Sequence, residues 1–413
     1  MLVVKVFGLF KEIAIANRFG VSDLVDSYTL ANAIVFWIPA IWISVINSVF
    51  VPLSHKLPSE SKENFQRNLF GVVALAGSIS TFALIFIATH FFPVIFDKHT
   101  ESGLAMLIQM CSGLAPIILI ALTSAHLSAL LLAKERHINT LTQIIPAAVL
   151  ILFLYFWPIS DSNTTLFIAG MLVGSLLRVL TLGYFCKKEN FKISPKIDDI
   201  SGVIQHLKSA LGLMVLSQLV ASFGPPIALY FAASLGEGSV SIFGYSLKII
   251  ALAVGLGATA TGRAVLPVLS SSSQSVSDKR KLAIQWALKL FLVGFFSAAI
   301  LWIVAIDLVK ITFERGAFSS TDTVAVAEMI QYGAIQLPFV FCNVVLAQFF
   351  ASQGAYRILF YSSGLGLTVN VISCFILIQF FFLPGLMLAK AAAVIVVNLF
   401  FFYRILRFQC NEK

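Results

Sequence analysis

Charged residues are scarce in this chain. They make up 11% of its 413 residues, whereas hydrophobic residues make up 59% and the mean hydropathy is +0.95. An ordinary globular chain has about 25% charged residues, so this composition excludes a soluble enzyme and a disordered protein. Cysteine is scarce too, and the five cysteines form no close pair, which excludes a disulfide scaffold and gives no zinc or redox motif. The class that remains is a polytopic helical membrane protein.

Long apolar runs fill most of the sequence. A helix needs about 20 apolar residues to cross a bilayer, so the chain is long enough for roughly twelve crossings. Apolar runs bounded by charged or turn residues predict about twelve transmembrane helices, at 1–19, 28–53, 69–96, 103–132, 140–158, 165–186, 210–235, 239–269, 283–312, 324–352, 359–383 and 386–406. The predicted fold is therefore an all-α polytopic membrane protein.

The positions of the basic residues indicate an orientation. If the N-terminus is cytoplasmic, most lysines and arginines outside the spans fall in inner loops, and only Arg18, Lys98 and Arg315 fall in outer loops. Because inner loops of membrane proteins are enriched in Lys and Arg, both termini are expected in the cytoplasm. The net charge of +9 is then explained by loops near anionic lipid headgroups and does not indicate nucleic-acid binding.

The longest polar loop divides the chain into two groups of six spans. The predicted domains are an N-terminal six-helix lobe at 1–186, a cytoplasmic linker at 187–208, a C-terminal six-helix lobe at 209–406 and a cytoplasmic tail at 407–413. Because each lobe has an even number of spans, both lobes enter the membrane from the same side. This predicts lobes related by a pseudo-twofold axis along the membrane normal.

Three lysines and one glutamate lie within predicted spans at positions where their charge requires an explanation. A charge near the bilayer centre costs roughly 2.5–3.5 kcal/mol on insertion scales, so it requires water, a partner or a function. Lys11 and Glu12 lie midway through the first span, and Lys248 lies roughly 14 Å below the outer end of the eighth. Lys5 is nearer the cytoplasmic edge. An excess of amines suits an anion with several negative oxygens; pairing of Lys11 with Glu12 and snorkelling of Lys5 are the structural alternatives.

Other polar residues have ordinary explanations. Five basic residues lie near span ends, where snorkelling is the default: Arg178, Arg263, Lys289, Lys310 and Lys390. Asp23 and Asp26 lie on the outer turn after Arg18, and Asp26 opens the second span; helix capping and a gate role are about equally expected there. His90 and His126 are far from other metal-ligand residues and are expected to be packing residues. The sequence therefore predicts neither a metal site nor a catalytic set.

Two other function classes stay open at this point. A drug or cation antiporter would need interior carboxylates, yet Glu12, beside Lys11, is the one mid-span carboxylate in the sequence. A membrane enzyme would need paired carboxylates, a histidine cluster or metal ligands at a membrane face. Asp97, His99 and Glu101 form such a group, but ordinary solvation explains them. We therefore expect a transporter and not an enzyme.

Three segments carry a recognisable pattern. The first is Lys5-Val-Phe-Gly-Leu-Phe-Lys-Glu-Ile-Ala-Ile-Ala-Asn-Arg-Phe-Gly20, followed by Asp26-Ser-Tyr and Phe50-Val-Pro52. The second is Phe313-Glu-Arg-Gly-Ala-Phe-Ser-Ser-Thr-Asp322, and the third is Ser239-Val-Ser, followed by Lys248 and Leu266-Pro267. Jointly, and in their order along the chain, they resemble the MurJ/MviN family of lipid II flippases, which belongs to the multidrug/oligosaccharidyl-lipid/polysaccharide exporter superfamily.

The resemblance implies a two-lobed flippase with a basic cavity. By position, Lys5, Lys11 and Lys248 match the family's cavity arginines that hold a lipid diphosphate, and Glu12 and Asp26 match its acidic positions. The family's outer-loop motif corresponds to Glu314, Arg315 and Gly316. Lysine at all three cavity positions keeps the charge but lacks the bidentate fork of arginine. The family usually has fourteen spans, and twelve are expected here, with Met1 already inside the first helix.

The function that the resemblance implies is lipid flipping by alternating access. A polyprenyl-diphosphate-linked saccharide of the lipid II type would move from the cytoplasmic to the periplasmic leaflet of the bacterial inner membrane. A flippase for a capsule or O-antigen repeat unit is the main alternative. The expected partners are the lipid-linked glycan and membrane lipids, with the protein a monomer. No cofactor is expected, and coupling to the membrane potential or to an ion stays open.

Overall fold

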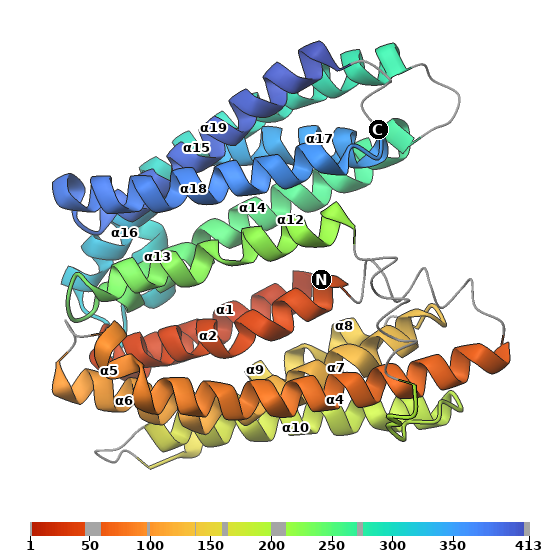
Figure 1. Ribbon diagram of the computed structural model, residues 1–413. Helices are drawn as coiled ribbons and strands as arrows, with labels where there is room; N and C mark the ends of the chain where they lie inside the picture. The colour runs from red at the N-terminus through yellow and green to blue at the C-terminus, as the bar shows by residue number, and fades with distance from the viewer. Residues whose placement is uncertain are drawn as a thin grey trace. The chain divides into compact units, whose positions relative to one another are not determined.

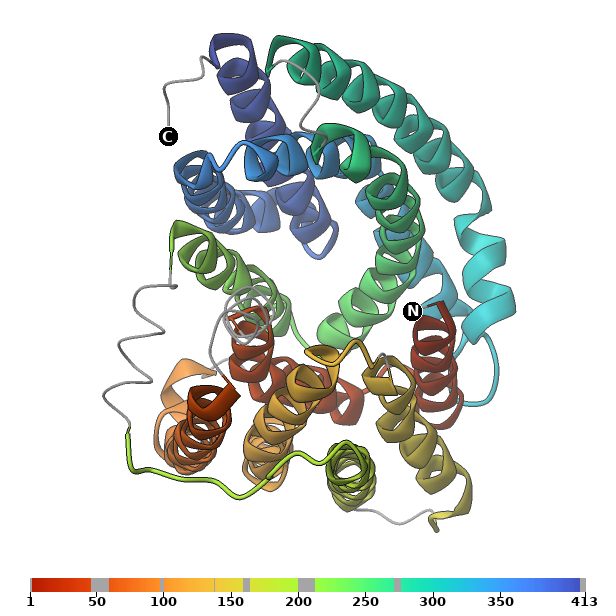
Figure 2. The ribbon, with the colours of Figure 1, turned by 90° about the vertical axis from the view of Figure 1, so that its right-hand side faces the viewer.

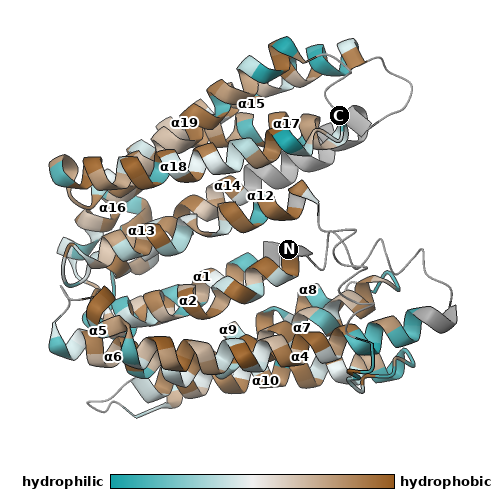
Figure 3. Ribbon diagram, viewed as in Figure 1, coloured by the Kyte–Doolittle hydropathy of each residue, from teal (hydrophilic) through white to brown (hydrophobic). Residues whose placement is uncertain are grey.

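A computed structural model describes residues 2–45, 59–96, 100–136, 138–158, 164–199, 212–270 and 276–408 (Figure 1). The described residues contain helices, turns and short irregular segments, and no strand occurs among them. This confirms the predicted all-α class. Figure 3 shows apolar residues along the middle of many helices and hydrophilic residues toward several helix ends, as expected for helices that cross a membrane.

The chain divides into two compact units. Unit 1 comprises Met1–Val215 with Gly236–Gly238, and unit 2 comprises Leu216–Leu235 with Ser239–Lys413. Unit 1 contains α1 (Leu2–Phe19), α2 (Asp23–Val45), α4 (Ser59–His90), α5 (Phe92–Ile95), α6 (Glu101–Leu114), α7 (Pro116–Leu132), α8 (Ile138–Thr142), α9 (Ile144–Phe156) and α10 (Thr164–Lys188). The predicted lobe and linker boundaries stay predictions.

Unit 2 is built from the remaining helices, coloured green to blue (Figure 2). They are α12 (Leu213–Ser222), α13 (Gly224–Ala233), α14 (Ser239–Ser270), α15 (Val276–Phe313), α16 (Ser320–Ala334), α17 (Leu337–Ser352), α18 (Tyr356–Phe381) and α19 (Pro384–Arg407). The first residues of α12 fall on the unit 1 side of the division.

Several predicted spans are pairs of shorter helices. Proline in the first turn marks three of the breaks, at the starts of α7, α13 and α17, because proline is tolerated there but cannot continue a preceding helix. α16 and α17 are bent by 45° at their break. The 213–233, 101–132 and 320–352 runs therefore each consist of two helices where the sequence pattern predicts one.

The described residues do not confirm the predicted number of twelve membrane crossings. Among the described residues, nine helices are long and apolar enough to span a membrane, or ten if the bent pair α16 and α17 is one span. α1 is not among these helices because four of its 18 residues are charged: Lys5, Lys11, Glu12 and Arg18. The described apolar stretch of α14, Ser239–Gly255, is short. The prediction of twelve crossings therefore stays a prediction.

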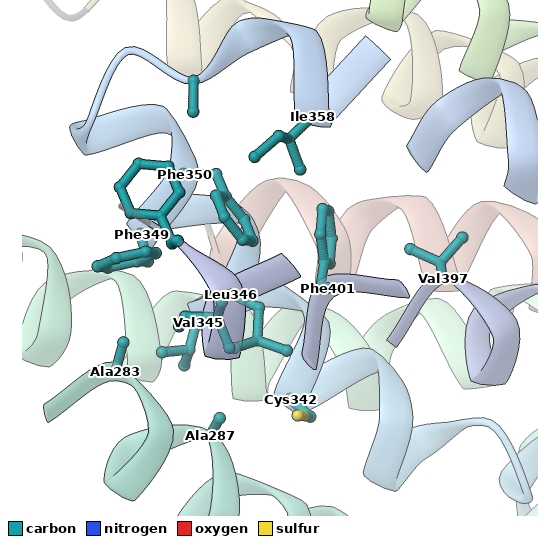
Figure 4. Close-up of a cluster of buried hydrophobic side chains, with 13 residues drawn as sticks. Ala283, Ala287, Cys342, Val345, Leu346, Phe349, Phe350, Ile358, Val397 and Phe401 are labelled. Carbon is teal, nitrogen blue, oxygen red and sulfur yellow. The ribbon is translucent and has the colours of Figure 1, made fainter. Parts of the chain in front are cut away.

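The interior of unit 2 is organised around α17. Val345, Leu346, Phe349 and Phe350 of this helix are completely buried, and they pack with residues of α15, α18 and α19 (Figure 4). By contrast, α15 exposes large side chains such as Ile303, which is 78% accessible. In a membrane protein such an exposed apolar face suits contact with lipid.

A glycine allows α15 to approach the break between α16 and α17 closely. A Cβ atom on Gly294 would lie 2.6 Å from the Cα atom of Pro338 and 2.9 Å from the carbonyl oxygen of Leu337. Both neighbours are backbone atoms, so a side chain cannot be accommodated by a change of rotamer. Gly364 of α18, in contrast, has open space around its Cα.

We expect Gly294→Ala to destabilise the protein and Gly364→Ala to leave it unchanged or more stable. The first substitution forces two helices apart, at a cost of about 1–3 kcal/mol, whereas the second gains helix propensity of up to about 1 kcal/mol. Thermal unfolding of the two purified variants in the same detergent compares them. Equal melting temperatures would show that α15 does not pack on this break as described.

Candidate functional site

α1 and α2 form a helical hairpin closed by a glycine turn. Gly20 has φ of 58°, a left-handed conformation that glycine adopts without steric cost, and its N–H donates to the carbonyl oxygen of Ala16 at 2.8 Å. α2 begins three residues later, at Asp23. The turn returns the chain beside α1, so that residues in the middle of α1 meet the second turn of α2.

Lys11 lies at this meeting point with two polar partners. Its Nζ atom is 2.9 Å from Oε1 of Glu12 and donates a hydrogen bond of 3.0 Å to the hydroxyl oxygen of Tyr28. The side chains of Lys11 and Glu12 are 13% and 9% accessible. The pairing of Lys11 with Glu12, which the sequence left open as the structural alternative, is therefore present. The assignment of Lys11 to substrate binding stays a prediction.

Tyr28 is held from the side opposite Lys11. Its ring stacks on Phe167 of α10 with centroids 4.4 Å apart, and its O–H points toward Sδ of Met171 at 4.0 Å. Phe167 also contacts Phe19, with ring centroids 5.4 Å apart. Tyr28 is thus a fixed acceptor for Lys11. The sequence analysis did not assign it a role, although it stands two residues after Asp26 in the first segment of the family pattern.

The first turn of α2 is attached to the start of α6. Oγ of Ser27 donates to the carbonyl oxygen of Gly103 at 3.3 Å, and Oγ1 of Thr100 contacts Oδ2 of Asp23 at 3.4 Å. Thr100 is also the N-cap of α6, where it accepts from the N–H of Gly103. Asp26 lies beside these residues and is 3% accessible. These contacts favour a structural role for Asp23, while the gate role of Asp26 stays untested.

Arg18 binds the end of another helix. Its guanidinium donates to the carbonyl oxygens of Leu154, Trp157 and Pro158, the latter two at 2.8 and 3.3 Å. These carbonyls lie at the C-terminal end of α9, where a cation satisfies unpaired acceptors and interacts favourably with the helix dipole. Arg18 therefore fixes α1 to α9, a structural role that its expected place in an outer loop did not indicate.

The other two predicted cavity lysines are exposed. Lys5 lies on α1, six residues before Lys11, and Lys248 lies on α14 in unit 2. On α14 the neighbouring residues Ser246, Ile249 and Ile250 are buried, so Lys248 projects from the accessible face of its helix. Exposure is what a substrate-binding amine requires, but the convergence of Lys5, Lys11 and Lys248 on one ligand stays a prediction.

The segment Phe313–Asp322 forms the turn between α15 and α16. Gly316 has φ of 62°, and Arg315 donates to the carbonyl oxygens of Ile311 and Thr312 at the end of α15. Oγ1 of Thr323 donates to Oε2 of Glu314 at 2.7 Å. The turn is therefore closed by contacts of Glu314 and Arg315 and by the backbone conformation of Gly316.

The same turn is anchored by aromatic rings and a capping box. Phe313 and Phe318 both contact Tyr245 of α14, with ring centroids 5.2 and 5.7 Å apart. Ser319 and Asp322 exchange side-chain and backbone hydrogen bonds at the start of α16, which satisfies otherwise unpaired N–H groups. The motif thus positions three helices of unit 2.

Metal-ligand groups are absent from the described parts of the chain, where no cluster of three or more His, Cys, Asp and Glu side chains occurs. His126 is buried and stacks on Phe70 with ring centroids 5.0 Å apart, as expected of a packing residue.

Several sequence-based assignments lie outside the described residues or side chains: Phe50–Pro52, Asp97, His99, Arg263 and Leu266–Pro267.

Two units of largely apolar helices, with a buried lysine–glutamate ion pair in the first, are typical of a multi-pass membrane protein. The family model for the lipid II flippase MurJ matches residues 15–411. The chain therefore belongs to the MurJ family, which confirms the resemblance found in the sequence. The curated relatives that it matches are named as probable lipid II flippases.

Individual comparisons agree with this assignment. A probable lipid II flippase MurJ from Buchnera aphidicola subsp. Baizongia pistaciae is 25% identical over 366 residues, which are 84% of this chain and 70% of the relative. A solved lipid II flippase MurJ in an inward closed conformation has a TM-score of 0.86 at 18% identity, covering 100% of this chain and 87% of that one. An inward-facing multidrug transporter of the MATE family gives 0.73 at 13% identity, covering 98% and 95%. The two structures show the shared fold.

The burial of the Lys11–Glu12 pair leads to a prediction about stability. Lys11→Met leaves the Glu12 carboxylate buried without its cation, which costs about 3–5 kcal/mol when a buried pair is broken. We expect a clear fall in melting temperature, and we expect the double variant Lys11→Met/Glu12→Gln to recover most of it. Lys289→Met, which removes an ammonium lying over the Trp286 ring at 5.3 Å, is the control and should change little. A double variant as unstable as the sum of both single variants would contradict the pairing.

Proposed function

We propose that the chain is a flippase that moves a polyprenyl-diphosphate-linked saccharide of the lipid II type across the bacterial cytoplasmic membrane. The observation that carries the proposal is the family match over residues 15–411. The buried ammonium of Lys11 supports it from the chemistry of the site. A lipid diphosphate needs positive charge to offset the loss of water from its phosphate oxygens, and a lysine in an otherwise apolar unit supplies it.

The hydrogen-bonding capacity of Lys11 suits such a ligand. An ammonium group has three N–H donors; without a ligand, one is directed to Glu12 and one to Tyr28. When a ligand is present, the ammonium can donate to a phosphate oxygen in a charge-assisted hydrogen bond. Under the proposal, Lys248 and Lys5 add further positive charge from exposed positions on α14 and α1.

The proposed transport makes and breaks no covalent bond. The headgroup enters from the cytoplasmic side, binds the lysines and leaves toward the periplasm as the protein alternates between two access states. The hydrocarbon tail stays in lipid. A membrane potential that is negative inside favours outward movement of an anionic headgroup, by roughly 2.3 kcal/mol per charge per 100 mV. Both termini lie in the cytoplasm under this proposal, as the distribution of Lys and Arg indicates, and the protein acts as a monomer.

A drug or cation antiporter is a weaker candidate despite the MATE-like fold. Such a transporter needs an interior carboxylate that is available to a cation. Glu12 is already occupied by Lys11 at 2.9 Å, and Asp26 lies in the first turn of α2, where the helix N-terminus stabilises its charge. The fold is compatible with both functions, but neither of these two carboxylates is available to a cation.

The proposal predicts that transport depends on two lysines. Loss of one charge-assisted hydrogen bond costs about 1.5–3 kcal/mol, so Lys11→Ala and Lys248→Ala should each slow flipping by at least about tenfold. Flipping of a fluorescent lipid-linked saccharide in proteoliposomes measures the rate, with Lys289→Ala as control. Insertion and melting temperature are recorded for each variant. Two well-folded lysine variants with wild-type rates would refute the assignment of the cavity lysines.

The identity of the glycan is tested in cells. If the substrate is of the lipid II type, depletion of the protein should cause a peptidoglycan precursor to accumulate in the cytoplasmic leaflet. Extraction and mass spectrometry of the lipid-linked saccharides identify it. Accumulation of a capsule or O-antigen repeat unit, with normal amounts of the peptidoglycan precursor, would replace lipid II by that substrate.

A further inference from the structure

The charges around Lys11 pose a problem for the binding of an anion. Among the described residues, the most deeply buried charged side chains are both acids, Glu12 at 7% and Asp26 at 3% accessible. Lys11 is paired with the first of them. The pair of Lys11 and Glu12 therefore carries no net charge when both are ionised. A diphosphate that binds Lys11 would bring further negative charge close to the Glu12 carboxylate.

We infer that Glu12 takes up a proton when the diphosphate binds Lys11, so that headgroup binding and proton binding are linked. The inference rests on the proposed function and adds a proton-binding site to it. The proton comes from water and joins a carboxylate oxygen of Glu12, the Lys11 ammonium exchanges that oxygen for a phosphate oxygen, and no covalent bond to the ligand forms. The net charge of Lys11 and Glu12 thereby changes from zero to plus one.

Glu12 is the acid that the structure favours for this role. It lies in the middle of α1, away from either helix end, and it forms an ion pair with Lys11. When Lys11 turns to a phosphate, burial disfavours the charged carboxylate and the neutral acid becomes the more stable form. Asp26 differs because it lies in the first turn of α2, where the helix dipole stabilises a negative charge.

The surroundings of Glu12 offer few other titratable groups. Tyr28 of α2 is the other titratable side chain in contact with Lys11, and its phenol cannot supply positive charge. α9 packs along α1 and contributes Tyr155, which is 73% accessible. On α1 itself, Arg18 is engaged with the end of α9, and Lys5 is exposed. Tyr28 keeps the ammonium in place while Glu12 releases it.

Linkage fixes the sign of the pH effect. Because the bound state holds more protons, affinity for the diphosphate rises as pH falls, by up to about tenfold per pH unit where Glu12 changes its protonation on binding. In Glu12→Gln the amide is neutral at every pH, so this contribution disappears while the Lys11 ammonium remains. The ionisation of the free ligand is the same for both proteins.

The test is calorimetric titration of the full chain in phosphatidylcholine nanodiscs with farnesyl diphosphate as the probe. Titration in two buffers of different ionisation enthalpy gives the number of protons taken up on binding, from mildly acidic to mildly alkaline pH. Glu135→Gln, an exposed acid in the turn after α7, is the matched control. We expect the wild type and Glu135→Gln to take up as much as about one proton more than Glu12→Gln, and we expect the affinity of Glu12→Gln to lose the corresponding pH dependence.

Two results overturn the inference in distinguishable ways. If Lys11→Ala abolishes binding but Glu12→Gln and wild type take up the same number of protons, the proton linkage is wrong and the proposed function stands. If Lys11→Ala binds the probe as tightly as wild type, the assignment of the diphosphate to Lys11 fails, and the linkage fails with it. Tyr28→Phe keeps the stacking surface and should preserve the proton number while weakening binding.

Discussion

The account of this protein depends on one ion pair inside an apolar helical unit. Removing an ammonium or a carboxylate from water is costly, and the attraction between them compensates only when the geometry is good and hydrogen bonds complete it. In unit 1 Lys11 and Glu12 are adjacent on α1, and Tyr28 completes the site from α2. The position of Tyr28 depends in turn on Phe167 and Met171 of α10. A single interior charge thus links three helices.

In both units, the few polar side chains bind helix ends and turns. Arg18 binds the carbonyl end of α9, Thr100 caps α6, and the Arg315 and Ser319 contacts close the turn between α15 and α16. In each case a polar side chain satisfies backbone groups that a helix end leaves unpaired. Motifs that signal the family therefore do not all mark the substrate site, because the Phe313–Asp322 segment is explained by the turn it builds.

Much of the fold could be predicted from the sequence because the solvent imposes it. Apolar runs of membrane length have to be helical when backbone groups cannot reach water, and the described helices coincide with the predicted runs. The breaks within those runs were harder to predict, since proline at 116 and 338 begins a new helix whereas Pro39 lies inside α2. Whether a proline begins a new helix or lies inside one depends on the residues that pack around it.

The candidate site was predicted only in part. Lys11 and Glu12 stand out in the sequence because charge is costly inside a span, and their pairing follows from adjacency. Tyr28 could not be identified in this way, because it is an ordinary residue until α1, α2 and α10 meet, and Phe167 is 139 positions further along the chain. The role of Arg18 depends in the same way on α9.

The most direct test of the central claim is a distance measurement between Lys11 and the phosphorus atoms of a bound lipid diphosphate. Rotational-echo solid-state NMR on nanodiscs containing protein with ¹⁵Nζ-labelled lysine and a polyprenyl diphosphate measures this dipolar coupling. The account predicts ¹⁵N–³¹P dephasing for a lysine signal that disappears in Lys11→Gln and persists in Lys289→Gln. Bound diphosphate that dephases no lysine signal, or one that Lys11→Gln leaves unchanged, would contradict it.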